Sequence, residues 1–260
     1  MNENVYQHFK SDEHDVIDKL ESQITKAQID YQPVLTDFLN PREIYIAQSL
    51  LGKDEPVKMS SFGGYQDADL KRVLFYPDYF KCEKEDFELA LLEIKYPKKF
   101  ATLHHGQILG SIMGSGIKRN VVGDIITDGS NWQIIVEHKI CSFLQEQVNQ
   151  IGKINVHLEP INLNAMLTPL CSWEEQNILV SSLRIDNLIA NCYRISRMRA
   201  KELINNNKVQ VNWGSIDHPD YLVNKYDIIS VRGFGRIRLN NVLGETRKQK
   251  LKVCVSIIKK

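Results

Sequence analysis

The chain has 260 residues, of which 43% are hydrophobic and 25% are charged, the composition of an ordinary globular protein. No segment approaches the roughly 20 apolar residues of a membrane-spanning helix, and the first ten residues lack the basic-then-apolar pattern of a secretory signal. The five cysteines are scattered without a CxxC pair, which disfavours a disulfide framework or a zinc site. We therefore expect a cytoplasmic protein without a membrane partner, metal or cofactor.

The net charge of +1 conceals an asymmetry along the chain. Residues 181–260 contain sixteen Lys and Arg against six Asp and Glu, a balance of +10, and the remainder has a balance of −9. Such a segregated positive charge is the electrostatic signature of a nucleic-acid-binding segment, although a solvated charged face would give the same composition.

Residues 1–67 show helical periodicity. Apolar residues recur at helical spacing after Asp12, through residues 16–24. A second helix is predicted to begin at Pro41, with Asn40 as its N-cap, and to end before Gly52. We therefore expect a small N-terminal helical subdomain.

Residues 68–162 are predicted to alternate between strands and helices. Strand–helix–strand followed by strand–helix–strand is the split βαβ arrangement of a ferredoxin-like sheet, so we expect a ferredoxin-like middle domain. The predicted strands span 73–76, 88–96, 121–127, 132–137 and 154–158, the last ending before Pro160, and the predicted helices span 105–113 and 140–151.

Residues 163–180 contain polar breaks and Pro169 and are predicted to be a linker. The last domain is expected to span 181–260 and to open with Ser181-Ser182, which can cap a helix over 183–190. A second helix is predicted to begin at Ser196. Strands are predicted at 209–212, 228–232, 236–239 and 252–257, which completes an α+β fold.

The residues best suited to binding lie in 184–214. Arg194, Arg197 and Lys201 are three and four residues apart, so they share a face if the helix extends over them. The helix start at Ser196 offers free backbone N–H groups and a positive dipole end, which suit a phosphate. Guanidinium groups can fork onto phosphate oxygens and stack on exposed bases. These features favour a surface for folded RNA.

Residues 183–235 contain three short patterns in this order: Arg-Ile-Asp, Ser-Arg-x-x-Ala-x-x-Leu-Ile and Val-x-Val-Asn. These patterns carry a resemblance to the alpha-L RNA-binding motif of small-subunit ribosomal protein four. Asn207 departs from the usual glycine, but Asn also tolerates a left-handed backbone. Trp213 interrupts the usual Val-Asn-Gly turn, so we expect a longer loop or a stacking surface there.

The alpha-L resemblance implies a structural role for Asp186, which would orient the first helix of the domain. It also implies RNA contacts, first from Arg184 and Arg197 and then from Lys201, Lys208 and Asn212.

Three further segments resemble the bacterial YlmH family along nearly the whole chain: Arg-Gly-Phe-Gly-Arg at 232–236, Gly-Glu-Thr-Arg-Lys at 244–248 and LGSIMGSGIKRNVVGDI at 109–125. The resemblance implies a helical start, a ferredoxin-like middle and a C-terminal alpha-L domain. It also implies binding to rRNA and tRNA, not DNA, on a large ribosomal subunit that carries stalled peptidyl-tRNA, in ribosome-associated quality control.

The later basic residues add candidate contacts. Gly233 and Gly235 would let the backbone approach closely. Arg232, Arg236 and Arg238 are predicted to contact phosphates from a strand. Lys118 and Arg119 are predicted to form a second RNA patch in the middle domain.

Few features indicate an enzyme. Residues 58–61 (KMSS) resemble the nucleotide-binding loop of class I aminoacyl-tRNA synthetases but lack its HIGH-type partner. Gly110, Gly114 and Gly116 lie in and after a predicted helix rather than between a strand and a helix start, so we expect them to permit close helix–sheet packing and a C-cap. The adjacent His104-His105 side chains diverge, without a ligand cluster.

We therefore expect a non-enzymatic RNA-binding factor that acts on the ribosome. The alternative is an enzyme that modifies tRNA or rRNA and uses the C-terminal domain for targeting. A cell-division or envelope-associated scaffold is a third class, which the sequence supports little.

Overall fold

The computed structural model describes residues 13–51, 56–169, 173–246 and 249–259. Contacts divide the chain into two compact units, Met1–Leu170 and Cys171–Lys260. Within the described residues, no helix is long and apolar enough to cross a bilayer. Asp12, Gly52 and the Arg247-Lys248 pair, which carried sequence predictions, lie outside these residues.

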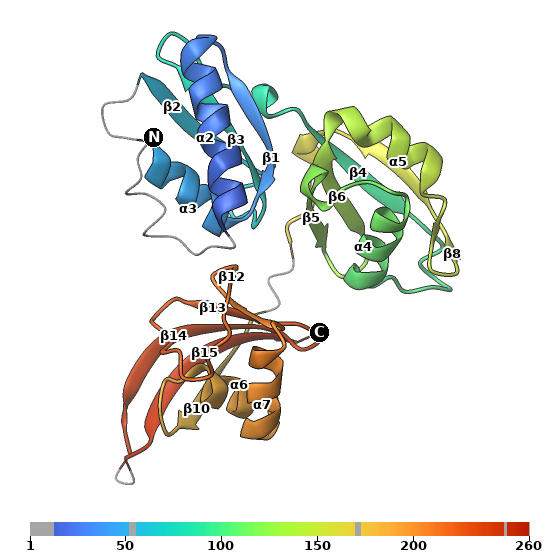
Figure 1. Cartoon of the computed structure of the whole chain (residues 1–260). Helices are drawn as coiled ribbons and strands as arrows, with labels where there is room; N and C mark the ends of the chain where they lie inside the picture. Colours follow the sequence, from blue (N-terminus) through green and yellow to red (C-terminus); the bar gives the residue numbers. More distant parts are fainter. Residues whose placement is uncertain (1–12, 52–55, 170–172, 247–248, 260) are drawn as a thin grey trace. The chain divides into compact units, whose positions relative to one another are not determined.

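The first unit begins with a three-stranded antiparallel sheet against which two helices pack (Figure 1). Both predicted helices are present, and Asn40 caps the second by accepting hydrogen bonds from the backbone N–H groups of Arg42 and Glu43. The sheet order is β1-β3-β2. The elements are α2 (His14–Ile29), β1 (Val34–Leu39), α3 (Pro41–Leu50), β2 (Val57–Phe62) and β3 (Lys71–Pro77).

This sheet corrects the predicted boundary at residue 67. Strand β3, which we assigned to the middle domain, is the central strand of the N-terminal sheet, with Val73 and Phe75 fully buried in its core. The N-terminal part is therefore mixed rather than purely helical. Strands β1 and β2 escaped prediction because polar residues such as Thr36 and Ser60 interrupt their apolar alternation.

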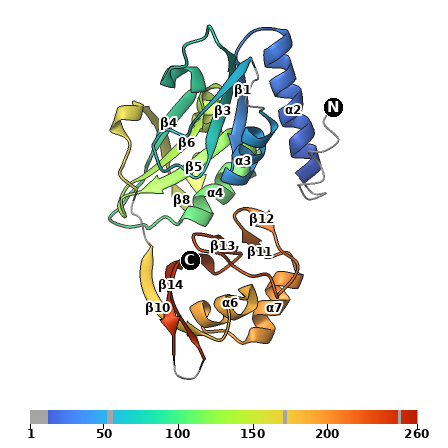
Figure 2. The same ribbon diagram turned by 90° about the vertical axis from the view of Figure 1, so that its left-hand side faces the viewer.

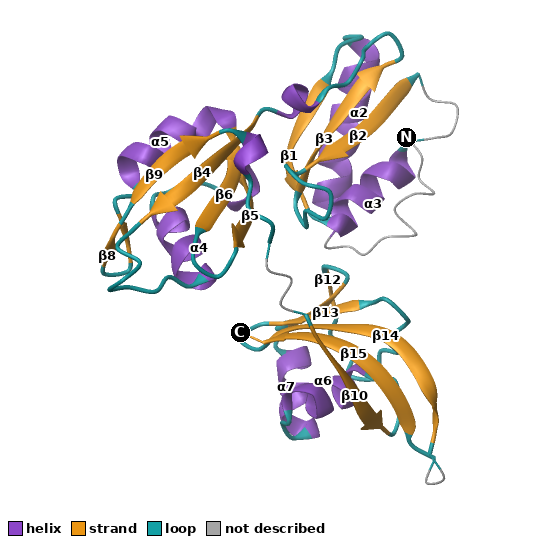
Figure 3. Ribbon diagram, turned by 180° about the vertical axis from the view of Figure 1, so that it is seen from behind, coloured by secondary structure: helices purple, strands orange, loops and turns teal. Residues whose placement is uncertain are grey.

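The middle part has the sheet order β5-β6-β4-β9 with every neighbouring pair antiparallel, the split βαβ order that the sequence predicts (Figure 3). Helices α4 and α5 bury Ile112 and Leu144 in the core on one face. On the other face, Leu91 and Ile135 pack against Phe38 of β1. The elements are β4 (Leu89–Lys95), α4 (His105–Gly114), β5 (Val122–Thr127), β6 (Trp132–Glu137), α5 (Cys141–Gln147), β7 (Gln150–Ile151), β8 (Ile154–Asn155) and β9 (His157–Ile161). Short 3-10 helices span Lys84–Phe87, Arg119–Val121, His138–Ile140 and Leu163–Ala165.

Three details of the middle part differ from prediction. Helix α5 ends at Gln147 rather than at residue 151, and Phe143 within it is 42% exposed although the predicted helix is amphipathic. Strand β9 continues through Pro160, because β9 lies at the sheet edge, where a missing N–H is tolerated. A Cβ added at Gly110 or Gly114 would have no atom within 4 Å, so helix–sheet packing does not require these glycines.

The second unit is a six-stranded antiparallel sheet in the order β10-β15-β14-β13-β11-β12, and helices α6 and α7 pack against it (Figure 2). Helices α6 and α7 share its core through Leu188, Leu203 and Ile204. The elements are β10 (Glu174–Val180), α6 (Ile185–Tyr193), α7 (Arg197–Asn205), β11 (Val209–Val211), β12 (Gly214–Ser215), β13 (Ile228–Val231), β14 (Gly235–Glu245) and β15 (Leu251–Lys259).

Strand β10 corrects the predicted linker at 163–180. All seven of its residues pair with β15, so the C-terminal sheet begins well before residue 181. The segment escaped prediction because it is an edge strand in which only Val180 is buried. The N-cap of α6 is Arg184 rather than the predicted Ser181-Ser182.

The residues that depart from the alpha-L pattern, Asn207 and Trp213, both have a left-handed backbone conformation. Asn207 has a φ of 53°, as expected for an Asn in place of glycine. Asn212 and Trp213 have φ values of 48° and 65° and form a two-residue hairpin turn between β11 and β12. The expectation of a longer loop is therefore wrong.

Candidate RNA interface

A buried carboxylate organises the start of both C-terminal helices. Asp186, in the first turn of α6, has 0% exposure. Its carboxylate accepts hydrogen bonds from Arg197 Nε at 3.0 Å and Nη2 at 3.3 Å, and from Arg184 Nε at 3.3 Å and Nη2 at 3.4 Å. Asp186 therefore fixes two guanidinium groups side by side at the position where α6 and α7 begin.

The electrostatics of this triad favour binding of an anion. Burial alone would raise the pKa of Asp186, but the hydrogen bonds and charges of Arg197 and Arg184 outweigh it and lower the pKa. One carboxylate faces two guanidinium groups, so the triad keeps a net positive charge. The side chains of Arg184 and Arg197 remain 34% and 49% exposed, which leaves N–H donors facing solvent.

Helix α7 extends this basic surface. Ser196 is its N-cap, as predicted, and its Oγ accepts a hydrogen bond from the backbone N–H of Arg199 at 3.1 Å. Lys201 is exposed and follows Arg197 by one helical turn, so the two side chains share a flank of the helix. We call Arg184, Arg197 and Lys201 the α7 flank.

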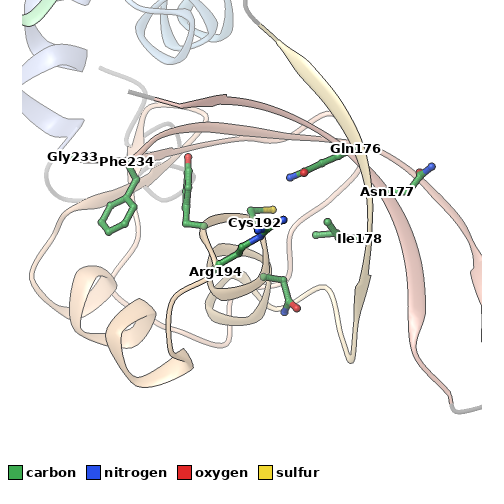
Figure 4. A pocket seen from close by; sticks show the side chains of 9 residues that line it. Gln176, Asn177, Ile178, Cys192, Arg194, Gly233 and Phe234 are labelled. Carbon is green, nitrogen blue, oxygen red and sulfur yellow. The ribbon is translucent and has the colours of Figure 1, made fainter.

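Arg194 does not join the α7 flank, contrary to the predicted shared face. It lies before the helix as the C-cap of α6, in a left-handed conformation with a φ of 53°. Its side chain lines an open hollow of about 560 Å³ together with Gln176, Asn191 and Phe234 (Figure 4). The helix does not extend back to residue 194, because the chain reverses there between α6 and α7.

Arg236 and Arg238 lie on the opposite face of the sheet from the helices. The residue between them, Ile237, is fully buried in the core, so alternation along β14 turns the two arginines outward. Arg236 lies over the ring of Trp213 at 5.7 Å from its centroid, and Arg238 lies over Trp173 at 5.0 Å. The predicted contacts are thus divided between two faces.

The remaining predicted contacts lie in turns. Arg232 is exposed, and its backbone N–H donates to the Lys208 carbonyl at 2.8 Å. The side chain of Asn212 donates to Asp227 at 2.7 Å and accepts from the Ile228 N–H at 2.9 Å. Because both polar groups of Asn212 hold the turn, a structural role accounts for it better than RNA contact.

Gly233 and Gly235 in the same region have φ values of 90° and 133°, so the hairpin geometry itself requires glycine. In the first unit, the KMSS segment lies in strand β2, where Lys58 pairs with Asp78 at 2.9 Å. It is not a nucleotide-binding loop.

The middle part carries its own exposed basic residues. Lys118 is exposed, whereas the guanidinium of Arg119 folds back to donate to the Val122 carbonyl. Sequence reasoning missed Phe100, which is 90% exposed and follows Lys98 and Lys99 in the loop between β4 and α4. The available signal was the placement of an aromatic residue directly after two lysines.

Comparisons with known proteins bear on both units. The model "YlmH, N-terminal" matches residues 12–80, and the model "Putative RNA-binding domain in YlmH" matches residues 82–165. The ribosome-associated protein quality control protein P2 of Bacillus subtilis (strain 168) is 38% identical over 249 residues, which are 96% of each chain. The chain belongs to the YlmH family. A solved structure, cell division protein ylmH from Streptococcus pneumoniae, is 36% identical with a TM-score of 0.54 and covers 63% of this chain and 99% of its own.

The YlmH family models coincide with the structural division of the first unit. The N-terminal model ends at residue 80, just after β3, and the second begins at residue 82. The second model describes an RNA-binding domain, and it covers the loop with Phe100 and the region of Lys118. Candidate RNA-binding residues of this chain therefore lie in both units.

Proposed function

We propose that this protein is a non-enzymatic RNA-binding factor of the ribosome, acting in the cytoplasm on the large subunit with a stalled peptidyl-tRNA. Ribosome association is supported by the similarity to the ribosome-associated quality control protein of Bacillus subtilis, and RNA binding by the family model that matches the middle part. The large subunit and the tRNA are finer expectations, which rest on the resemblance that the sequence shows.

The pairing of Arg184 and Arg197 on the buried Asp186 carboxylate carries the proposal. Two guanidinium groups held in a fixed relation can bridge adjacent phosphates with little loss of side-chain entropy. Charge-assisted contacts to phosphates position a protein on RNA without reading its base sequence. The mechanism is therefore positional: the α7 flank grips an RNA backbone while the middle part contacts RNA through its own domain.

Sedimentation of the full-length protein with ribosomal particles tests the proposal. We expect the wild type to migrate with large subunits and to dissociate as salt increases. Arg197→Ala should weaken the association and flatten the log–log salt dependence by roughly one unit, because one phosphate contact is lost.

Arg199→Ala is the matched control. Arg199 lies on the same helix, but roughly 200° around it from Arg197, and it pairs with Glu202 at 2.8 Å. Its loss should leave sedimentation unchanged. If Arg197→Ala and Arg184→Ala sediment like the wild type, the α7 flank is not the RNA contact and the proposal fails.

A further inference from the structure

The outer face of the C-terminal sheet carries an arrangement that the α7 flank does not use. Two arginines on β14, separated by one buried residue, each lie over a tryptophan ring. Side chains two residues apart on a strand are separated by roughly 7 Å. The Trp213–Arg236 and Trp173–Arg238 stacks are therefore neighbours on one face, which we call the stacking face.

Hydrogen bonds hold one of these stacks in place. Arg238 Nε donates to Asn240 Oδ1 at 3.2 Å, and Asn240 Nδ2 donates to Ser256 Oγ at 2.8 Å. Ser256 is only 3% exposed, so the network is anchored in the sheet. A planar cation fixed over an aromatic ring loses little further freedom when a ligand binds to it.

The chemistry of this face suits unpaired nucleotides. Exposed bases stack on aromatic rings and on guanidinium planes, and the guanidinium charge attracts the neighbouring phosphates. Glu175, an acidic residue at the margin of the face, is hydrogen-bonded to Asn240 at 3.3 Å. A positively charged, aromatic and prearranged surface is complementary to single-stranded RNA.

We infer that the stacking face, formed by Trp173, Trp213, Arg236, Arg238 and Asn240, binds unpaired bases of RNA, separately from the α7 flank that grips the backbone of folded RNA. The inference rests on the proposed function, because it takes RNA to be the ligand of the C-terminal unit. It adds a second surface, with a different preference for RNA structure, to the C-terminal unit.

Binding of two labelled RNAs to the full-length protein tests the inference by fluorescence anisotropy. One probe is a single-stranded oligoadenylate of about eight nucleotides, within the site sizes of single-strand-binding folds. The other is a fully paired RNA stem. The central variant is Arg236→Lys with Arg238→Lys, which keeps the net charge but removes both guanidinium planes.

The double lysine variant should bind the oligoadenylate about fivefold or more weakly, with binding of the paired stem essentially unchanged. Arg197→Ala should bind the paired stem more weakly than the wild type does, with binding of the oligoadenylate essentially unchanged. Arg199→Lys, the same exchange at a position on α7, should bind both probes like the wild type. Trp213→Leu, checked for folding by circular dichroism, should also lose affinity for the oligoadenylate.

Two outcomes would overturn the inference in distinguishable ways. If the paired stem binds in an Arg197-dependent manner but oligoadenylate binding is unaffected by the double lysine variant, the proposed function stands and the stacking face serves another class of partner. If neither RNA binds the wild type, the proposed function fails and the stacking face fails with it.

Discussion

The Asp186 carboxylate and the Arg197 guanidinium, 3.0 Å apart at their closest hydrogen-bonded atoms, connect the first turn of α6 to the first residue of α7. Asp186→Asn should lower the free energy of unfolding of the C-terminal unit by about 1–3 kcal/mol, because charge-assisted hydrogen bonds are lost at a buried site. It should also weaken ribosome association, since Arg197 is no longer held. Urea denaturation and sedimentation measure the two effects.

Asp217→Asn is the control for this change. Asp217 has a side chain that is 76% exposed, so the same substitution there should leave both measurements unaltered. Unchanged stability in Asp186→Asn would contradict the role of Asp186 as the organising carboxylate.

The lowered pKa of Asp186 predicts a pH dependence of stability. The unfolded chain has the ordinary aspartate pKa of about 3.9, so the ionised carboxylate stabilises the fold above that pH and ceases to do so as pH falls through the lower folded pKa. The difference in unfolding free energy between wild type and Asp186→Asn should be constant from about pH 7 to pH 5 and should shrink below about pH 4. A difference that persists at lower pH would indicate packing rather than charge.

Local patterns in the sequence predicted the parts of the fold that depend on neighbours in the chain. The Ser196 cap and the capped start at Pro41 follow from spacing over a few residues. Strand β10 does not, because its edge position gives it little burial and its pairing with β15 joins residues about eighty positions apart.

The candidate site likewise combines features that local sequence predicts with features that depend on distant strands. The association of Asp186 with the arginines is encoded in a short motif, whereas the Trp173–Arg238 stack depends on the register of three strands. A change of one residue in that register would turn Arg238 into the core. The sequence therefore indicated Arg238 but not the Trp173 ring beneath it.

Arg72 should be essential to the first unit. Its side chain is 5% exposed, donates to the Thr36 carbonyl at 2.8 Å and lies 3.7 Å from the fully buried Glu137 carboxylate of β6. Arg72→Met should lower the free energy of unfolding by about 3–5 kcal/mol, because the buried Glu137 carboxylate loses its buried partner and keeps the exposed Lys139, 2.5 Å from its other oxygen. Urea denaturation of the full-length protein, followed by circular dichroism, measures the loss.

A double variant and a surface control sharpen the Arg72 prediction. Arg72→Met with Glu137→Met should recover much of the lost stability, since the buried carboxylate is removed together with the buried guanidinium. Lys58→Met, which removes an exposed ion pair to Asp78, should change stability little. If the double variant were less stable than Arg72→Met alone, the buried charge would not be the source of the loss.

Two glycines of the middle part should respond in opposite directions to alanine. A Cβ at Gly123 would lie 2.7 Å from the Phe38 ring and 3.2 Å from the Ile135 carbonyl oxygen, so Gly123→Ala should destabilise the unit by about 1–3 kcal/mol through overpacking. Gly110 lies inside α4 with no atom within 4 Å of an added Cβ, so Gly110→Ala should stabilise it by up to about 1 kcal/mol. Urea denaturation of both variants measures the contrast. A destabilising Gly110→Ala would mean that the α4 surface is covered in the protein.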